Sequence, residues 1–382
     1  MLPPLAQCAP LRARSQRPNP MHKLLKPSLD WLFAFIPVSL VLERAHVPAP
    51  VLFFSAALAI VPIARLIVAA TEQLATRTGD AVGGLLNATF GNAPELIIAL
   101  VALRGGHFDM VRASLIGAIL ANLLLAMGVA FFLGGLRHHN QEYNSSAARL
   151  YSSMMLIATL SLAVPSAFSR FFAEGAMPQE GALNLSTAFV LLAAYGLYLV
   201  FMLKTHPDYF KSAGGDQSHG HEGSSWSVGR AVGSLVAASV LAAWMSEILV
   251  GAAEGTGKAL GMSEVFIGIV FLAIVGGAAE SGSAIAMGRK NKVDLTVGIA
   301  MGSSIQIALF VAPLLVLASY FVAPRPMALA FSRAETGTLF LGVLIGAMVA
   351  GDGRSNWYKG IQLVTVYAII AILFYFLPVS KP

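Results

Sequence analysis

The chain has 382 residues, of which 57% are apolar and only 12% charged, about half the roughly 25% that is typical of soluble domains. Its 25 basic and 19 acidic residues are too few to cover a soluble globule, and they leave long apolar blocks between them, as in a protein with several membrane spans. This composition argues against a soluble enzyme, a nucleic-acid-binding module, a disordered chain and a disulfide scaffold. Cys8 is the only cysteine, which excludes an internal disulfide and a thiolate metal site.

Residues 1–28 are rich in Pro and Arg and contain no apolar run long enough for a signal peptide. We expect them to form a disordered cytoplasmic tail, with Met21 as an alternative start. Eleven apolar segments follow, most of them near the ~20 residues that cross a ~30 Å hydrocarbon core. They are 29–45, 50–76, 81–103, 112–136, 148–169, 184–203, 229–251, 262–287, 294–319, 335–350 and 358–377.

The basic residues between these segments predict the orientation of the chain. With the N-terminus inside, 16 Lys and Arg fall in inside segments and 8 in outside segments, which favours a cytoplasmic N-terminus and an external C-terminus. The compact chain points to a prokaryotic inner membrane. The polar stretch 205–228 is typical of a solvated cytoplasmic linker. The alternative is a metal or pH sensor built from His206, Asp208, Asp216, His219, His221 and Glu222.

An internal repeat relates the two halves of the chain at an offset of 185 residues. Between 91–124 and 276–309, eight positions are identical without gaps. Apolar segments often match by chance, whereas charged residues inside and between spans do not. The identities include Glu95/Glu280, Arg104/Arg289, Asp109/Asp294 and Gly117/Gly302.

The number of spans predicts how the two copies of the repeat are oriented relative to each other in the membrane. One span, 29–48, stands alone, and two sets of five follow in 49–204 and 229–382. Because five is odd, the second set crosses the membrane in the opposite sense. We therefore predict an all-α integral membrane protein of about eleven transmembrane helices, with one N-terminal helix plus two inverted-topology five-helix repeats. Many secondary transporters share this architecture and bind their substrate near the midplane, where the repeats meet.

Two glutamates mark that midplane. Glu95 and Glu280 each lie nine residues before the Arg that ends their span, roughly 13 Å along a helix and close to the bilayer centre. A carboxylate there costs around 2.5–3.5 kcal/mol on insertion scales and is a functional residue by default. The alternative is a structural salt bridge. Two carboxylates without thiolates form a hard site that suits Ca²⁺, Mn²⁺ or Mg²⁺, and the same groups can bind protons when the cation leaves.

A divalent cation such as Ca²⁺ needs six to eight oxygen ligands, more than two carboxylates supply. Further oxygens are expected from backbone carbonyls at helix breaks beside Pro94 and Gly276-Gly277. The candidate side-chain ligands are Asn92, Asn87, Ser281, Ser303, Ser304, Gln306 and Asn122.

Other acidic residues lie toward the ends of spans. Glu72 is expected at the inner vestibule and Glu254 at the outer vestibule, while Glu247 lies within the seventh span. The alternative is that each is a snorkelling or paired residue near an interface. Asp109 and Asp294 are expected at helix starts, where acidic side chains are favoured.

At these motifs the sequence resembles the Ca²⁺/H⁺ antiporters of the cation/proton exchanger (CAX) family, within the Ca²⁺/cation antiporter superfamily. The resemblance covers nearly all of residues 29–377. The motifs that carry it are 70–75, 83–96, 246–250, 276–280, 290–295, 302–310 and 352–357.

The resemblance implies eleven helices, exchange of cytosolic Ca²⁺ for protons, and Glu95 and Glu280 as the essential cation site. The accessory acidic positions of the family correspond to Glu72 and Glu247. The sequence departs from the family motif at Gly277, where Asn is usual, and at Ser281, where His is usual. One oxygen and one imidazole are therefore missing, which bears on cation preference and proton stoichiometry.

The expected function is thus export of cytosolic Ca²⁺ in exchange for H⁺, with Ca²⁺ as transported substrate, no cofactor and no nucleic-acid partner. The closest alternative is another cation pair: Na⁺ for Ca²⁺, or K⁺, Na⁺ or Mn²⁺ for H⁺. An intramembrane enzyme is disfavoured because no His-Glu-x-x-His motif is present and no span supplies a buried His beside a Ser. A channel is the third class, which saturating, counter-ion-coupled flux would exclude.

Overall fold

The computed structural model describes residues 29–78, 80–171, 177–210 and 226–377. The first half of the chain forms helices, short 3-10 or π segments (η) and one short strand. These are η1 (Leu29–Ala34), α2 (Phe35–Arg44), α3 (Ala49–Thr78), α4 (Asp80–Phe90), α5 (Ala93–Arg104), α6 (Phe108–Leu120), η2 (Ala121–Ala126), α7 (Met127–His138), β1 (Gln141–Glu142), α8 (Ser145–Phe171), α9 (Met177–Val200), η3 (Phe201–Thr205) and η4 (Pro207–Phe210).

The second half contains the same kinds of element. They are α10 (Val228–Leu260), α11 (Glu264–Phe266), η5 (Ile267–Leu272), α12 (Ala273–Gly276), α13 (Ala278–Arg289), α14 (Val293–Gln306), η6 (Ile307–Val311), α15 (Ala312–Val322), α16 (Arg333–Ala350), β2 (Arg354–Ser355) and α17 (Trp357–Phe376). The expected all-α membrane class is confirmed. Within the described ranges, eight helices are long and apolar enough to cross a membrane.

A ninth candidate span is sharply bent. Residues Glu264–Gly276 and Ala278–Arg289 pass the same test together, with a 61° bend between them. The predicted breaks beside the two glutamates are therefore present. In the first half, α4 ends at Phe90 and α5 begins at Ala93. Pro94 has no N–H to donate to a carbonyl one turn earlier, so a continuous helix is interrupted there.

The seventh predicted span is longer than the sequence indicated. Apolarity predicts an end at residue 251, whereas α10 continues to Leu260 and is closed by Gly261 in the left-handed conformation. The added turns contain Glu254 and Lys258, which pair one turn apart with Lys258 Nζ 2.6 Å from Glu254 Oε1, and such a pair adds a small stabilisation to a helix. Glu254 is therefore a helical residue near the end of α10.

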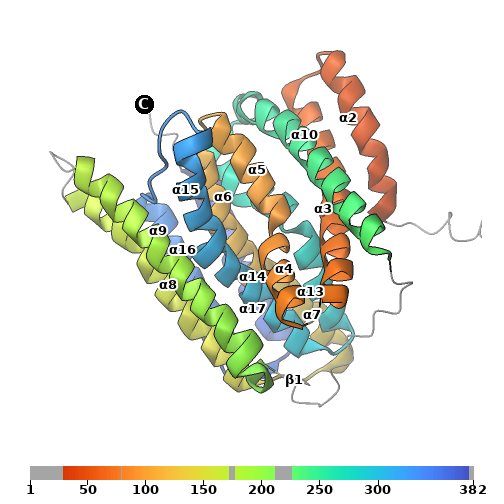
Figure 1. Cartoon of the computed structure of the whole chain (residues 1–382), viewed down its shortest axis with the longest axis vertical. Coiled ribbons are helices and arrows are strands. Elements are labelled where there is room, and N and C mark those ends of the chain that lie inside the picture. Colours follow the sequence, from red (N-terminus) through yellow and green to blue (C-terminus); the bar gives the residue numbers. More distant parts are fainter. Residues whose placement is uncertain (1–28, 79, 172–176, 211–225, 378–382) are drawn as a thin grey trace, which may run out of the picture.

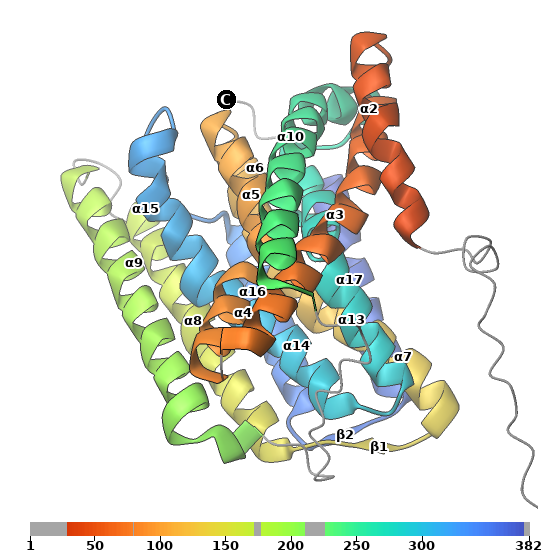
Figure 2. The ribbon, with the colours of Figure 1, turned by 45° about the vertical axis from the view of Figure 1, so that its right-hand side comes forward.

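The helices pack around two hydrophobic clusters. One is centred on α3 and α10, which lie side by side in both views (Figures 1 and 2) and bury Phe53, Ile60 and Met245. The other is larger and lies among α6 to α9 and α14 to α17. The glutamate-bearing helices contact both groups, because α5 packs against α10 and α15, and α13 packs against α3 and α7.

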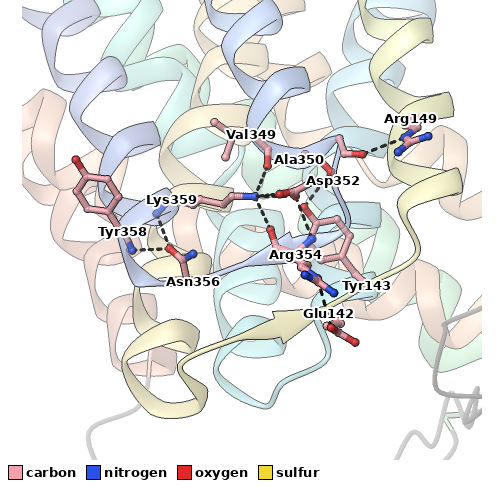
Figure 3. A network of polar contacts seen from close by, with 11 residues as sticks. Glu142, Tyr143, Arg149, Val349, Ala350, Asp352, Arg354, Asn356, Tyr358 and Lys359 are labelled. Carbon is pink, nitrogen blue, oxygen red and sulfur yellow. Dashed lines mark hydrogen bonds and ion pairs between the residues drawn. The ribbon is translucent and has the colours of Figure 1, made fainter.

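One end of the molecule, which we call the linker side, carries the strand pair β1–β2. Gln141 faces Ser355 and Glu142 faces Arg354 in antiparallel register. Figure 3 shows how side chains from α17, α8 and the loop after β1 hold the C-terminal end of α16. Lys359 Nζ, Tyr143 Oη and Arg149 Nε donate to successive backbone oxygens of Val349, Ala350 and Gly351, at 3.2, 2.9 and 3.1 Å. The two cationic donors also suit the negative end of the helix dipole.

Asp352 completes this cap from the loop after α16. Its carboxylate accepts from Lys359 Nζ at 2.6 Å. Partial burial opposes ionisation of Asp352, but the hydrogen bond and charge of Lys359 and the backbone N–H of Arg354 together outweigh it and lower the pKa of the carboxyl below its ordinary value. The ion pair is therefore present throughout the neutral pH range.

We expect Tyr143→Phe to destabilise the protein by about 1 kcal/mol, because the Ala350 carbonyl loses a hydrogen bond in a buried setting. Tyr143 is 5% exposed. The measurement is the apparent Tm of purified protein in detergent, with Tyr358→Phe as the matched control because Tyr358 is 58% exposed. Equal Tm values for wild type and Tyr143→Phe would contradict the expected role.

Some expectations fall outside the described residues. These are the tail at 1–28, most of the linker with Asp216, His219, His221 and Glu222, and the last five residues. The predicted linker begins in ordered structure, since Pro207–Phe210 is a 3-10 turn and His206 stacks on Phe201 with ring centroids 4.4 Å apart.

Candidate cation site

The two central glutamates occupy the same position in their local structure. Glu95 is the third residue of α5, after Asn92 at the N-cap, and Glu280 is the third residue of α13, after Gly277 at the N-cap. A carboxylate in a first helical turn is favoured by the helix dipole. Each glutamate therefore follows a helix break that also brings backbone into the interior of the bundle.

Each carboxylate approaches the helix break of the other half. A Cβ placed on Gly276 would lie 2.9 Å from Glu95 Cγ, and one placed on Gly277 would lie 3.6 Å from Glu95 Oε1. In the other direction, a Cβ on Gly91 would lie 3.5 Å from Glu280 Oε1. The absence of a side chain at Gly276 is what allows Glu95 to come this close.

The site is rich in buried polar atoms without partners. Both oxygens of Glu95 and Oε2 of Glu280 are buried and accept no hydrogen bond. Unpaired buried carboxylate oxygens are costly, and a bound cation or proton would remove that cost. Within the described ranges, no three His, Cys, Asp or Glu side chains gather in a metal-binding group, so further ligands must be amides, hydroxyls or backbone oxygens.

Three amides surround the carboxylates. Asn92 Nδ2 donates to Gln306 Oε1 at 2.5 Å, a contact between the two halves of the chain. Asn92 and Asn122 are 1% and 2% exposed, and Asn92 Oδ1 and Asn122 Nδ2 have no hydrogen-bond partner. Asn122 reaches the site from η2, a π segment that interrupts the α6–α7 helix, and such segments often occur at functional positions.

A cavity of about 380 Å³ reaches Glu280 from the linker side. It runs from Glu280 and Gly302 to Pro207 and Phe210 of η4. Its polar lining comprises Glu72, Asn87, Glu280, Ser283, Asp294, Ser303 and Gln306, with Tyr151 and Tyr198 on one wall. Glu72, predicted from the sequence as a vestibule residue, is one of the residues that line this cavity.

Glu95 lies in a much tighter space. The cavity at its carboxylate measures about 10 Å³, room for about one water molecule. Ser114 is the other polar lining residue, among apolar groups such as Ile98, Leu272 and Val311. The two carboxylates therefore differ in access, because Glu280 borders the large linker-side cavity whereas Glu95 borders a cavity of about 10 Å³.

Glu247 and Glu254 lie apart from the central site. Glu247 Oε1 is 3.8 Å from Arg104 Nη1, and both side chains are largely exposed. Glu247 also lines a separate cavity of about 420 Å³ with Glu43 and His46, near the turn between α2 and α3. Glu254 pairs with Lys258 on the exposed surface of α10.

One of the predicted hydroxyl ligands bonds to backbone oxygens elsewhere. Ser304 donates to Ala300 O at 2.8 Å and lies 3.4 Å from Ile119 O, so it serves helix packing. Ser281 is not among the residues that line either cavity at the glutamates. Sequence reasoning missed Ser283. This residue lies about one helical turn after Glu280 and lines the linker-side cavity. The 3.6-residue period from Glu280 was the signal that would have found it.

Asp109 and Asp294 both begin helices, as expected. Asp109 pairs with Arg112 in the first turn of α6. Asp294 has an additional place in the structure, because its Oδ1 accepts from the backbone N of Asn144 at 2.7 Å while it lines the linker-side cavity.

Comparison with known proteins agrees with this arrangement. The sequence profile described as "Sodium/calcium exchanger protein" matches residues 48–204 and again residues 230–376. The chain belongs to the sodium/calcium exchanger family. It is therefore a member of a family of membrane transporters, and the resemblance to cation/proton exchangers noted in the motifs is confirmed.

Relatives of this exchanger-family chain match along almost their whole length. A "Ca(2+)/H(+) antiporter" of Aphanothece halophytica is 38% identical over 91% of this chain and 96% of the relative. The "Ca(2+)/H(+) antiporter ChaA" of Bacillus subtilis is 41% identical over 90% of this chain and 97% of the relative. The solved structure of native YfkE has a TM-score of 0.79 and 38% identity, covering 92% of this chain and 100% of that one.

Proposed function

We propose that this protein exchanges cytosolic Ca²⁺ for H⁺, and that Glu95 and Glu280 bind the cation or protons in competition. The observation that carries the proposal is the pair of buried carboxylates with unpartnered oxygens, each set against the helix break of the opposite half. Oxygen-only surroundings favour a hard cation such as Ca²⁺. The relatives named Ca²⁺/H⁺ antiporters give independent support for that ion pair.

The proposed architecture has eleven transmembrane helices, with one N-terminal helix at 29–48 followed by inverted five-helix repeats at 49–204 and 229–382. The two separate matches to the family profile support this division. The equivalent helix breaks before Glu95 and Glu280 support it as well. Residues 1–28 are proposed as a cytoplasmic tail and 205–228 as a cytoplasmic linker, in a prokaryotic inner membrane.

With that orientation the linker side faces the cytoplasm. The 380 Å³ cavity then exposes Glu280 to the cytosol, while the space beside Glu95 measures only about 10 Å³. This corresponds to an inward-open state in an alternating-access cycle. Ca²⁺ would enter past Glu72 and Asn87, displace protons from the central carboxylates, and leave after the outer side opens.

The test is Ca²⁺ uptake by inside-out vesicles that contain the purified protein. An imposed pH gradient, acidic inside, should drive saturable Ca²⁺ uptake, and Ca²⁺ addition should in turn dissipate the pH gradient. The alternative is exchange of another cation pair. Uptake that responds to an Na⁺ gradient and ignores the pH gradient would establish that alternative and reject Ca²⁺/H⁺ exchange.

We expect Glu72→Gln to slow Ca²⁺ binding and release mainly on the cytoplasmic side, because Glu72 lines the cavity on that side only. A negative charge at the mouth raises the local cation concentration, and this effect is screened by salt. The measurement compares Ca²⁺ KM from each face in vesicles of defined orientation. Equal changes on both faces would reject the assignment.

A further inference from the structure

The linker-side cavity has an aromatic wall that the proposed exchange does not use. Three rings of this wall, which we call the aromatic corner, are those of Tyr151 in α8, Tyr198 in α9 and Phe210 in η4. The Phe210 ring centroid lies 5.5 Å from that of Tyr151 and 6.5 Å from that of Tyr198, with the planes inclined by 39° and 80°. Such rings give Ca²⁺ none of the oxygen ligands that it takes, whereas their negative faces attract organic cations.

The charged residues of this cavity are all acidic. Among the described residues that line it, Glu72, Glu280 and Asp294 are acidic and none is Lys, Arg or His. Charges of one sign in a cleft with low-dielectric walls raise the local concentration of ions of the opposite sign. The cavity therefore attracts cations in general, and the chemistry of its walls decides which of them stay.

Asn144 joins the aromatic corner to one of these carboxylates. Its backbone N donates to Asp294 Oδ1 at 2.7 Å, and its Nδ2 donates to the backbone oxygen of Tyr209 in η4 at 3.1 Å. On α14, a Cβ placed on Gly298, one turn after Asp294, would lie 4.0 Å from Tyr151 Oη. A carboxylate and the aromatic rings therefore lie at the same end of the cavity.

We propose that the aromatic corner binds an organic ammonium ion with a compact apolar body, which enters from the linker side and blocks the access of Ca²⁺ to Glu280. Aromatic cages recognise quaternary ammonium groups in this way. The cavity of about 380 Å³ falls within the ~300–1,000 Å³ of small-molecule sites, far more space than one metal ion occupies. Binding at the aromatic corner is independent of the proposed function, and only the blocking of Ca²⁺ rests on it.

The first experiment measures binding of tetrapropylammonium to the purified full-length protein in detergent, by titration calorimetry without Ca²⁺. We expect saturable binding by the wild type. Phe210→Leu keeps an apolar side chain but removes the ring, and should weaken binding by roughly three- to tenfold. Phe210→Tyr keeps the ring and should bind as the wild type does. Asp294→Asn should also weaken binding, because the amide keeps an oxygen for the backbone N of Asn144 but carries no charge.

Tyr209→Leu is the matched control for Phe210→Leu. Tyr209 is the neighbour of Phe210 in η4, is 41% exposed and is not among the residues that line the cavity. Tetrapropylammonium should therefore bind Tyr209→Leu with wild-type affinity. Equal weakening in both variants, or wild-type affinity in Phe210→Leu, overturns the proposal. Tyr198→Leu takes the place of Phe210→Leu if the latter does not give a monodisperse protein, and is scored in the same way.

The second experiment measures Ca²⁺ uptake in vesicles of defined orientation. Tetrapropylammonium added on the linker side should inhibit uptake competitively, and added on the opposite side it should have no effect. N-methylglucamine, which carries the same charge on a hydrophilic body, should not inhibit. Equal inhibition from both sides, or by both cations, overturns the proposed block.

The two experiments separate this inference from the proposed function. A wild type that binds tetrapropylammonium but does not exchange Ca²⁺ for H⁺ rejects the proposed function. A wild type that exchanges these ions and shows no saturable binding of tetrapropylammonium rejects the inference alone.

Discussion

Glu95→Gln and Glu280→Gln are each expected to lower Ca²⁺ flux by roughly 100-fold or more, since loss of even an outer partner of a metal ligand costs 10–100-fold. Glutamine keeps the shape of the side chain and one oxygen, but it carries no charge and cannot exchange a proton. Both carboxylates have buried oxygens without hydrogen-bond partners, so we expect each charge to be needed to bind the cation. The measurement is pH-gradient-driven Ca²⁺ uptake in inside-out vesicles.

A binding measurement separates loss of the site from loss of the fold. Ca²⁺ should raise the apparent Tm of the wild type, because a ligand that binds only the folded state stabilises it, and this rise should vanish in both variants. Glu142→Gln is the control, since Glu142 forms an exposed pair with Arg354, and such pairs contribute little. Full Ca²⁺ uptake by either Glu95→Gln or Glu280→Gln would overturn the site.

The same substitution at Gly117 and Gly302 is expected to have opposite consequences, although the two glycines are repeat counterparts. A Cβ on Gly117 would lie 2.1 Å from the backbone oxygen of Ile269, while one on Gly302 meets nothing within 4 Å. Gly117→Ala should therefore lower stability by at least the 1–3 kcal/mol that is typical of overpacking. Gly302→Ala should raise the apparent Tm slightly, because alanine inside a helix is favoured over glycine by roughly 0.5–1 kcal/mol.

This difference follows the asymmetry of access. Gly117 lies where its helix packs tightly against the backbone of Ile269, whereas Gly302 lines the open linker-side cavity. Under the proposed alternating access, Gly302 must become tightly packed when that cavity closes. Gly302→Leu is then expected to keep the wild-type Tm and to slow Ca²⁺ turnover. Wild-type turnover by Gly302→Leu would exclude closure of the cavity at this position.

Several features were predictable because they are local. The apolar blocks gave the membrane class, and eight described helices are long and apolar enough to span. Pro94 and the Gly276-Gly277 pair predicted helix breaks at the positions where they occur. The length of α10 was not predictable from apolarity, because its last turns carry the charged residues Glu254 and Lys258 and end at Gly261.

The candidate site likewise contains features that were predictable from the sequence and features that were not. The 185-residue repeat singled out Glu95 and Glu280, since shared charged residues inside spans are costly and rarely accidental. It could not tell which hydroxyls face the carboxylates. Ser304 is used in helix packing, while Ser283 lines the cavity, and this choice depends on how each helix is rotated against its neighbours.

The scarcity of charge in the sequence by itself determined that this is a membrane protein, and the repeat determined which carboxylates are central. Only the tertiary structure decided that the halves differ. Glu280 adjoins a large cavity and Glu95 a much smaller one, and Asn92 has a partner amide where Gly277 leaves a space beside Asn122. The physical reason is that composition and spacing are properties of the chain, whereas access and pairing depend on contacts between segments far apart in the sequence.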